Sequence, residues 1–328
     1  MAGQGVGRFA WSTHRFSRGG RPQGMTTQSI RAGVVGLGSM GLGIAASLVR
    51  AGIETWGFDP NPTAGKAFAD KGGHVAASPA EVGAQADVLF CVVVNAAQAE
   101  AALLGEAGAA AAMAPGSVVV QCATCAPDAV RALARPILEA GLLFIDGPIS
   151  GGAAKAATGE ITVMASGDPA AFAKARPAFD AVAAKVFDLG TEIGAGSQVK
   201  FVNQLLAGVH IAAAAEAMAY GISGGCDPKA LFEVITASAG NSWMFENRVP
   251  HILDDDYVPR SAVDIFVKDL GLVHGSAHAR KFPLPLTAQA LQMFTQASAM
   301  GLGREDDAAV VKIFPGVALP SRGGKDPA

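Results

Sequence analysis

The sequence predicts an α/β domain followed by an all-α domain. Over residues 30–189, short apolar runs typical of strands alternate with stretches of helical periodicity. This alternation indicates a parallel sheet with helices on both faces. From Gly196 onward strand signals nearly vanish, while helical periodicity continues to Phe314. A chain of 328 residues has room for about two domains.

The glycine-rich turn near the start of the first domain is the most specific pattern. An apolar run, Ala32–Val35, leads directly into Gly36-Leu37-Gly38-Ser39-Met40-Gly41, and a helical pattern follows. In such a strand–turn–helix unit the first glycine permits the tight turn, the second lets a pyrophosphate approach, and the third allows close helix packing. The spacing alone is weak evidence in a chain with 41 glycines. Its context predicts a Rossmann-type dinucleotide-binding domain whose helix N–H groups face the phosphates.

An acidic residue ends the second expected strand, Thr55–Phe58. Asp59 stands 18 residues after Gly41, where a carboxylate binds the ribose hydroxyls of NAD and repels the 2′-phosphate of NADP. The next residues, Pro60 to Pro62, include no arginine to receive that phosphate. We therefore predict NAD as the cofactor; the alternative is that Asp59 is only a turn residue before Pro60.

The other expected elements follow in chain order. Further strands are expected at His74–Ala76, Val88–Val94, Ser117–Gln121, Leu143–Asp146, Ile161–Ala165 and Lys185–Leu189. Helices of the second domain are expected at Gln198–Ser223, Pro228–Ser238, Ser242–Leu253, Asp264–Arg280, Pro285–Met300 and Asp306–Phe314. We divide the chain into a disordered extension (1–28), a dinucleotide-binding domain (29–193), a helical substrate and dimerisation domain (194–316) and a tail (317–328).

Composition argues against several partners. Half of the residues are apolar, 16% are charged, and the net charge of −3 gives no reason to expect nucleic acid or an anionic membrane. The long apolar stretch Phe201–Gly221 contains Asn203, Gln204, His210 and Glu216, and is too polar for a bilayer span. We interpret it as a helix buried in its domain or between subunits, and expect a cytoplasmic homodimer or homotetramer.

Residues 1–24 are rich in glycine and arginine and lack the apolar segment of a secretory signal. We expect these residues to be a disordered extension upstream of the natural first residue, Met25. The alternative is a transit-like segment.

The cysteines and histidines give weak signals. Cys122 and Cys125 form a C-x-x-C without a second such pair, so incidental thiols are favoured over a redox pair. His274 and His278 stand one helical turn apart without a third ligand, which favours a solvated helix face. No metal site is predicted.

Four further segments carry residues suited to chemistry: 121–127, 146–152, 194–204 and 266–270. In the second, a serine precedes two glycines, a combination that exposes a hydroxyl and backbone N–H groups suited to a carboxylate. With the glycine motif, these segments resemble, in the same order, the β-hydroxyacid dehydrogenases, the family of 3-hydroxyisobutyrate dehydrogenase and tartronate semialdehyde reductase. The resemblance covers residues 30 to about 315.

The resemblance implies a role for each segment. Substrate carboxylate would be held by Ser150, Gly151 and Gly152, and Lys200 would be catalytic. The cofactor-binding set would be Gly36, Leu37, Gly38, Ser39, Met40, Gly41, Asp59, Asn95, Thr124, Lys268 and Asp269. Two departures stand out: Ala123 replaces the family's serine, and Gln204 replaces its second asparagine, after Asn203. Segments 93–98, 204–210 and 239–248 match the subgroup that oxidises C2 of a four-carbon sugar acid.

The chemistry requires a base for the hydroxyl proton as hydride leaves carbon. A lysine can act as this base where burial favours its neutral form, and Lys200 is the candidate. Gln204 lies one helical turn later on the same face and can bond the substrate hydroxyl; Asn203 is the alternative. Asn241 and Trp243, with Ser242 and Asn247, are candidates for contacting the other hydroxyls, or are a helix cap and a packed tryptophan.

Two competing functions remain open. The first is reduction of a small semialdehyde, such as tartronate, succinic or methylmalonate semialdehyde. The second is a non-catalytic dinucleotide-binding module, which would be expected to lack Lys200.

Overall fold

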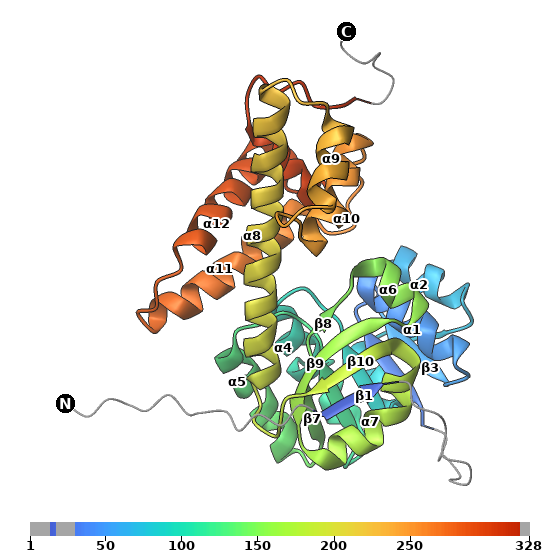
Figure 1. The fold of residues 1–328 in the computed structure, drawn as a ribbon. Helices are drawn as coiled ribbons and strands as arrows, with labels where there is room; N and C mark the ends of the chain where they lie inside the picture. The colour runs from blue at the N-terminus through green and yellow to red at the C-terminus, as the bar shows by residue number, and fades with distance from the viewer. Residues whose placement is uncertain (1–13, 18–29, 322–328) are drawn as a thin grey trace, which may run out of the picture. The chain divides into compact units, whose positions relative to one another are not determined.

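The computed structural model describes residues 14–17 and 30–321 (Figure 1). The chain divides into two compact units, Met1–Lys200 and Phe201–Ala328. The division falls inside the long helix α8 (Ala195–Ser223). The first turns of α8 therefore belong to the α/β unit, although the sequence placed the boundary where this helix begins.

The α/β unit is built on one sheet. Among the described residues its strand order is β1-β10-β9-β7-β6-β5-β2-β3-β4, with β8 paired to β9. The strands are β1 (His14–Ser17), β2 (Ala32–Val35), β3 (Thr55–Phe58), β4 (His74–Val75), β5 (Val88–Cys91), β6 (Val118–Gln121), β7 (Leu143–Asp146), β8 (Ile149–Ser150), β9 (Ile161–Gly167) and β10 (Ala183–Asp188). The six strands from β7 to β4 are all parallel.

Seven helices of the described part cover the two faces of this sheet: α1 (Ser39–Arg50), α2 (Pro62–Ala69), α3 (Pro79–Gln85), α4 (Ala96–Leu104), α5 (Pro127–Glu139), α6 (Gly152–Thr158) and α7 (Pro169–Val182). Alternate strand residues enter two separate cores. Val34 and Phe90 pack with α1 and α7, whereas Val35 and Leu89 pack with α3, α4 and α5. The central strands β2, β5 and β6 are buried on both faces, which explains their continuous apolar runs.

The sheet departs from a purely parallel arrangement after β7. Strand β9 pairs antiparallel with β7 through Asp146 and Ser166, and β10 then runs parallel to β9. The expectation that the runs near 161 and 185 extend the same sheet is confirmed. Because the short β8 and α6 lie between β7 and β9, the chain reverses direction there, which the sequence pattern did not indicate.

Part of the N-terminal extension is ordered. His14–Ser17 pair antiparallel with β10, with His14 opposite Asp188. This strand covers the open edge of the sheet through backbone hydrogen bonds, which need no apolar pattern in the sequence. This strand lies within the segment 1–28 that the sequence predicts to be a disordered extension. The rest of that prediction lies outside the described residues, as do the interpretation of Met25 and residues 322–328 of the tail.

The second unit is helical. After α8 come α9 (Pro228–Thr236), α10 (Trp243–Leu253), α11 (Val263–Ala279) and α12 (Pro285–Ala297), followed by a π-helical turn, η2 (Ser298–Leu302), and a 3₁₀ helix, η3 (Asp307–Ile313). Phe266 and Phe294 stack with their ring centroids 5.1 Å apart in its core. The helix expected at 306–314 is a 3₁₀ helix. The helix expected to reach Met300 ends as an α-helix at Ala297, and the π-helical turn after it contains Gly301 with a positive φ of 87°.

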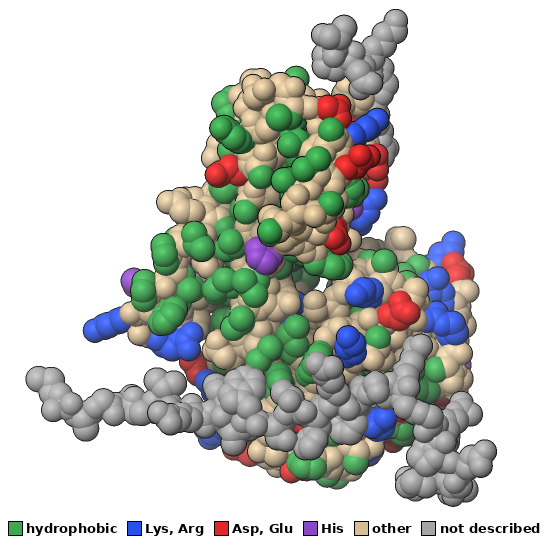
Figure 2. Space-filling view, in the orientation of Figure 1, with side chains coloured by type: hydrophobic (Ala, Val, Ile, Leu, Met, Phe, Trp, Pro, Cys, Tyr) green, Lys and Arg blue, Asp and Glu red, His purple; other side chains and the backbone are tan. Residues whose placement is uncertain are grey.

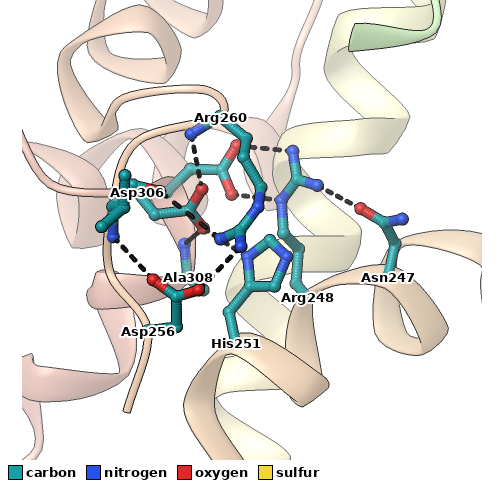
Figure 3. A network of polar contacts seen from close by, with 9 residues as sticks. Asn247, Arg248, His251, Asp256, Arg260, Asp306 and Ala308 are labelled. Carbon is teal, nitrogen blue, oxygen red and sulfur yellow. Dashed lines mark hydrogen bonds and ion pairs between the residues drawn. The ribbon is translucent and has the colours of Figure 1, made fainter. Parts of the chain in front are cut away.

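A buried ionic network joins α10 to η3 (Figure 3). Arg248 pairs with Asp307, and the ring Nδ1 of His251 lies 2.8 Å from Asp306 Oδ1. The backbone N–H groups of Arg260 and Ala308 also donate to Asp306. Both carboxylates are inaccessible to solvent, so these partners satisfy charges that would otherwise be costly to bury.

In the described residues, helix α8 is long and apolar enough to cross a membrane by length and composition alone. This is weak evidence, because the central helix of a packed domain passes the same test.

Candidate active site

The glycine turn after β2 forms a cradle that side chains would fill. Gly36 has a φ of +93°, and a Cβ there would lie 2.4 Å from the Val92 carbonyl oxygen. A Cβ on Gly41 would lie 1.8 Å from the carbonyl oxygen of Gly36. At Gly38 a Cβ would meet nothing within 4 Å, so open space faces this residue. Gly36 thus permits the turn and Gly41 the close packing of α1, while the open space at Gly38 leaves room for the ligand approach that the sequence predicts.

The N-terminus of α1 opens beside this space. Gly38 is its N-cap, no side chain caps the helix, and its first turn contains no acid. Ser39 is exposed and Met40 is half-buried. Helix N–H groups without a side-chain acceptor are suited to a pyrophosphate. The residues present therefore fit a dinucleotide, which this site would hold at the carboxyl end of β2, the strand that has β3 on one side and β5 on the other.

Asp59 lies next to the glycine turn and is half-buried. Its Oδ2 accepts the N–H of Leu37 at 2.8 Å, and its Oδ1 accepts the N–H of Asn61 at 2.8 Å. The side chain of Leu37 is in the core. Asp59 therefore holds the turn in place and retains lone pairs that can accept ribose hydroxyls.

Asn95 and Thr124 follow the ends of β5 and β6 at the same sheet edge. Asn95 Oδ1 caps α4 by accepting the N–H of Gln98 at 2.9 Å. Thr124 is half-buried between Ala123 and Cys125, which are buried. The Gln121 amide holds this loop, since Oε1 accepts the Ala123 N–H at 2.5 Å and Nε2 donates to the Ala123 carbonyl at 3.0 Å.

The C-x-x-C thiols are buried in this same region. Burial raises the pKa of Cys122 well above its usual value, and it raises the pKa of Cys91, a buried thiol at the end of β5 outside this motif, to about 12. Thiolates are the reactive form, so burial makes these thiols poor redox groups. Among the described residues, no group of three His, Cys, Asp or Glu side chains could hold a metal ion.

The serine–glycine turn lies between β8 and α6. Ser150 ends β8 and is half-buried, while Gly151 and Gly152 have positive φ values of 133° and 72°. Consecutive residues in this region turn their N–H groups toward a common point, which suits an anion. The stem of Lys155 packs against Gly151, because a Cβ on that glycine would lie 3.0 Å from the Lys155 Cβ and Cδ. Lys155 is not among the site residues predicted from the sequence.

Lys200 meets the same loop. It is buried, and its Nζ donates to the carbonyl oxygen of Ile149 at 2.8 Å. The preceding turn of α8 is held by Asp146, whose carboxylate accepts the N–H groups of Gly194 and Ser197 and the Ser197 hydroxyl. The structure thus brings Lys200 beside the residue that precedes Ser150, within one compact unit.

The helical unit assembles a second group of the predicted residues. Gln204 Nε2 donates to Asp269 Oδ2 at 2.5 Å, and Asn203 Nδ2 donates to Gln204 Oε1 at 3.0 Å. Lys268 Nζ lies 2.7 Å from Asp269 Oδ1. Gln204 is therefore oriented by a buried carboxylate from α11, a partner that the sequence spacing did not reveal.

The segment around α10 shows mostly local contacts. Ser242 caps α10 by accepting the N–H of Phe245 at 3.1 Å, as the alternative interpretation proposed. Asn241 Nδ2 donates to the Thr236 carbonyl and to Glu246, while Trp243 is 56% exposed. Asn247 Oδ1 accepts from Arg248, at the margin of the ionic network (Figure 3).

Comparisons with known proteins match both units. Residues 31–190 match the NAD binding domain of 6-phosphogluconate dehydrogenase, and residues 194–314 match the domain described as NAD-binding of NADP-dependent 3-hydroxyisobutyrate dehydrogenase. The chain belongs to the 3-hydroxyisobutyrate dehydrogenase-like family of β-hydroxyacid dehydrogenases. It is an oxidoreductase that uses NAD(P) and acts on small hydroxy acids, as the sequence predicted.

Relatives within the family are similar over nearly their whole length. The L-threonate dehydrogenase of Cupriavidus necator is 59% identical over 290 residues, which are 88% of this chain and 98% of that protein. The L-threonate dehydrogenase of Haemophilus influenzae is 50% identical over 91% of this chain and 100% of its own. The crystal structure of a 3-hydroxyisobutyrate dehydrogenase from Salmonella typhimurium superposes with a TM-score of 0.82 at 52% identity, over 87% of this chain and all of the other.

Proposed function

We propose that this enzyme oxidises C2 of L-threonate to the 2-oxo acid with NAD in the cytoplasm. The observation that carries the proposal is the contact of Lys200 Nζ with the Ile149 carbonyl, beside the Ser150-Gly151-Gly152 turn. A base is thereby held next to a turn suited to a carboxylate. The relatives that bear the name L-threonate dehydrogenase support this choice of substrate.

Each group has a part in the reaction. The glycine turn, the α1 N-terminus and Asp59 hold the cofactor, with Asn95, Thr124, Lys268 and Asp269 as further contacts. A bound NAD would supply the acceptor for the hydride that leaves C2. Ser150, Gly151 and Gly152 hold the carboxylate, which orients the adjacent C2. Lys200 accepts the proton of the C2 hydroxyl, and Gln204 or Asn203 donates an amide hydrogen bond to that oxygen.

The carboxylate of Asp59 would discriminate between the two cofactors. Its remaining lone pairs would accept the 2′- and 3′-hydroxyls of NAD, and its charge would repel the 2′-phosphate of NADP. The NAD preference therefore depends on a single side chain.

Substrate choice is tested with a panel of hydroxy acids followed at 340 nm. The panel contains both threonates, both erythronates, glycerate, 3-hydroxyisobutyrate and 4-hydroxybutyrate. Because an unmet buried polar group costs about 1–3 kcal/mol, analogues without the C3 or C4 hydroxyl should lose roughly 5- to 150-fold in kcat/KM for each missing partner. Asn241 and Trp243 are the candidates for those contacts. A higher kcat/KM for 3-hydroxyisobutyrate or 4-hydroxybutyrate than for L-threonate would contradict the sugar-acid assignment.

The second candidate function is the reduction of a small semialdehyde. The Salmonella structure described as a 3-hydroxyisobutyrate dehydrogenase favours it. Tartronate, succinic and methylmalonate semialdehydes with NADH test it in the same assay, since faster turnover of one of them than of L-threonate would establish it.

We also propose a homodimer or homotetramer paired through the helical unit. Val202, Leu206 and Tyr220 of α8 are 53%, 48% and 81% exposed, and Figure 2 shows many hydrophobic side chains on the visible face of this unit. A second subunit would remove this apolar surface from water. Light scattering at micromolar concentration should give at least twice the chain mass; a monomer would contradict the pairing.

A further inference from the structure

Polar groups at the end of β7 and at the start of α8 form one hydrogen-bonded cluster. Asp146 ends β7 and is fully buried, and its Oδ1 accepts the Ser197 hydroxyl at 2.6 Å. Its Oδ2 accepts the N–H groups of Ser197 at 2.8 Å and Gly194 at 3.1 Å. Asp146 therefore caps the N-terminus of α8 from a neighbouring strand, in place of a cap residue of the helix itself.

The second residue of α8, Gly196, lets the helix approach two backbone carbonyl groups of the sheet closely. A Cβ on Gly196 would lie 2.4 Å from the Met164 carbonyl oxygen and 2.5 Å from that of Asp146. The Gly196 N–H donates to Ser166 Oγ at 3.2 Å. The first turn of α8 is thus fixed against β7 and β9 before the helix reaches Lys200.

We infer that Asp146 and Ser197 are positioning residues that fix Lys200 relative to the Ser150-Gly151-Gly152 turn. Asp146 precedes this turn by only four residues, so one loop carries both the helix cap and the carboxylate-binding groups. The Ile149 carbonyl that accepts Lys200 Nζ belongs to that loop too. Neither residue touches substrate; both act through the placement of the base. The inference rests on the proposed role of Lys200.

Asp146→Asn and Ser197→Ala test this inference, with Thr55→Val as the matched control. Thr55 is as buried as Ser197, and its hydroxyl donates to the Ile53 carbonyl at 2.8 Å. It lies at the start of β3, at the amino ends of the parallel strands and away from the proposed site. Each of the first two variants should lower kcat roughly 10- to 100-fold, because small misplacements of a catalytic group cost rate steeply. NADH affinity should stay unchanged, and Thr55→Val should keep its kcat. Ser197→Thr, which restores a hydroxyl, should recover activity.

The pH profile of the reverse reaction is a readout that a purely structural role would not change. Burial raises the pKa of Asp146 to about 6, opposed by its hydrogen bonds with Ser197 and Gly194 and by the charge of Arg131; Cys122 is the other titratable group facing it. In reduction Lys200 donates a proton, a role that a falling pH favours, so the base itself does not account for a loss of activity in acid. Protonation of Asp146 should therefore lower the wild-type reduction rate as the pH falls through about 6.

The free energy of unfolding should rise as the pH falls, in the opposite direction to the reduction rate. Because folding raises this carboxyl pKa, the folded state binds the proton more tightly, and its contribution to stability grows as the pH falls through 6. A falling rate with undiminished stability supports positioning, and Asp146→Asn should lack this acidic limb. A wild-type rate that stays constant from pH 7 to 5 overturns the inference, as does an unchanged kcat in folded Ser197→Ala. If Lys200→Ala keeps wild-type turnover, the assignment of Lys200 as the base is wrong, and the positioning inference is wrong with it. If Lys200→Ala loses turnover but the Asp146 and Ser197 variants keep it, as Thr55→Val should, only the positioning inference is wrong.

Discussion

Lys200→Ala should lower turnover by about 10²- to 10⁴-fold, the usual contribution of a general acid–base group. The reason is local: the buried Nζ is held at 2.8 Å from the Ile149 carbonyl, and alanine leaves no group there to take the C2 proton. The glycine turn and Asp59 remain intact, so NADH binding should be nearly unchanged. Steady-state kcat and a fluorescence titration with NADH measure the two effects separately.

Lys174→Ala is the matched control for this variant. Lys174 Nζ also donates to a backbone carbonyl at 2.8 Å in the α/β unit, but its acceptor is Gly116, before β6, at the opposite edge of the sheet. It should keep wild-type turnover. A Lys200→Ala enzyme with more than a tenth of wild-type kcat would remove Lys200 from the role of base.

Asp59→Ala should weaken kcat/KM for NAD by roughly 10- to 150-fold, since hydrogen bonds to charged groups are worth about 1.5–3 kcal/mol. Part of this loss comes from the turn itself, because the Leu37 N–H loses its acceptor. Asp59→Asn separates the two contributions: its amide oxygen can still accept from Leu37, while the negative charge is gone. The asparagine variant should therefore bind NAD better than the alanine variant and accept NADP better than the wild type does.

Asp87→Asn is the control for charge removal. Asp87 Oδ2 accepts the Arg31 N–H at 2.8 Å at the opposite edge of the sheet, a contact matching that of Asp59 with Leu37. Its ratio of NAD to NADP efficiency should equal that of the wild type. If the wild type uses both cofactors with equal efficiency, Asp59 does not select NAD.

Local sequence was sufficient for the fold class of both units and for most of their helices and strands. The glycine turn after Ala32–Val35, the buried strands of the parallel sheet and the helices after Gly196 all depend on interactions within a few residues. Backbone conformation, hydrophobic periodicity and the special freedom of glycine act at that range. The same information placed Asp59 at the end of β3 and Lys200 on the helix that follows the sheet.

The tertiary structure alone decided how the predicted side chains are held. Asp146 and Ser197 are 51 residues apart in the chain, and Gln204 and Asp269 are 65 apart. The partners Asp307 and Arg248, the antiparallel entry of β9 and the addition of β1 to the sheet edge are equally non-local. Such pairings leave no periodic trace in the sequence. They arise because each buried polar group must find a partner once folding has removed it from water.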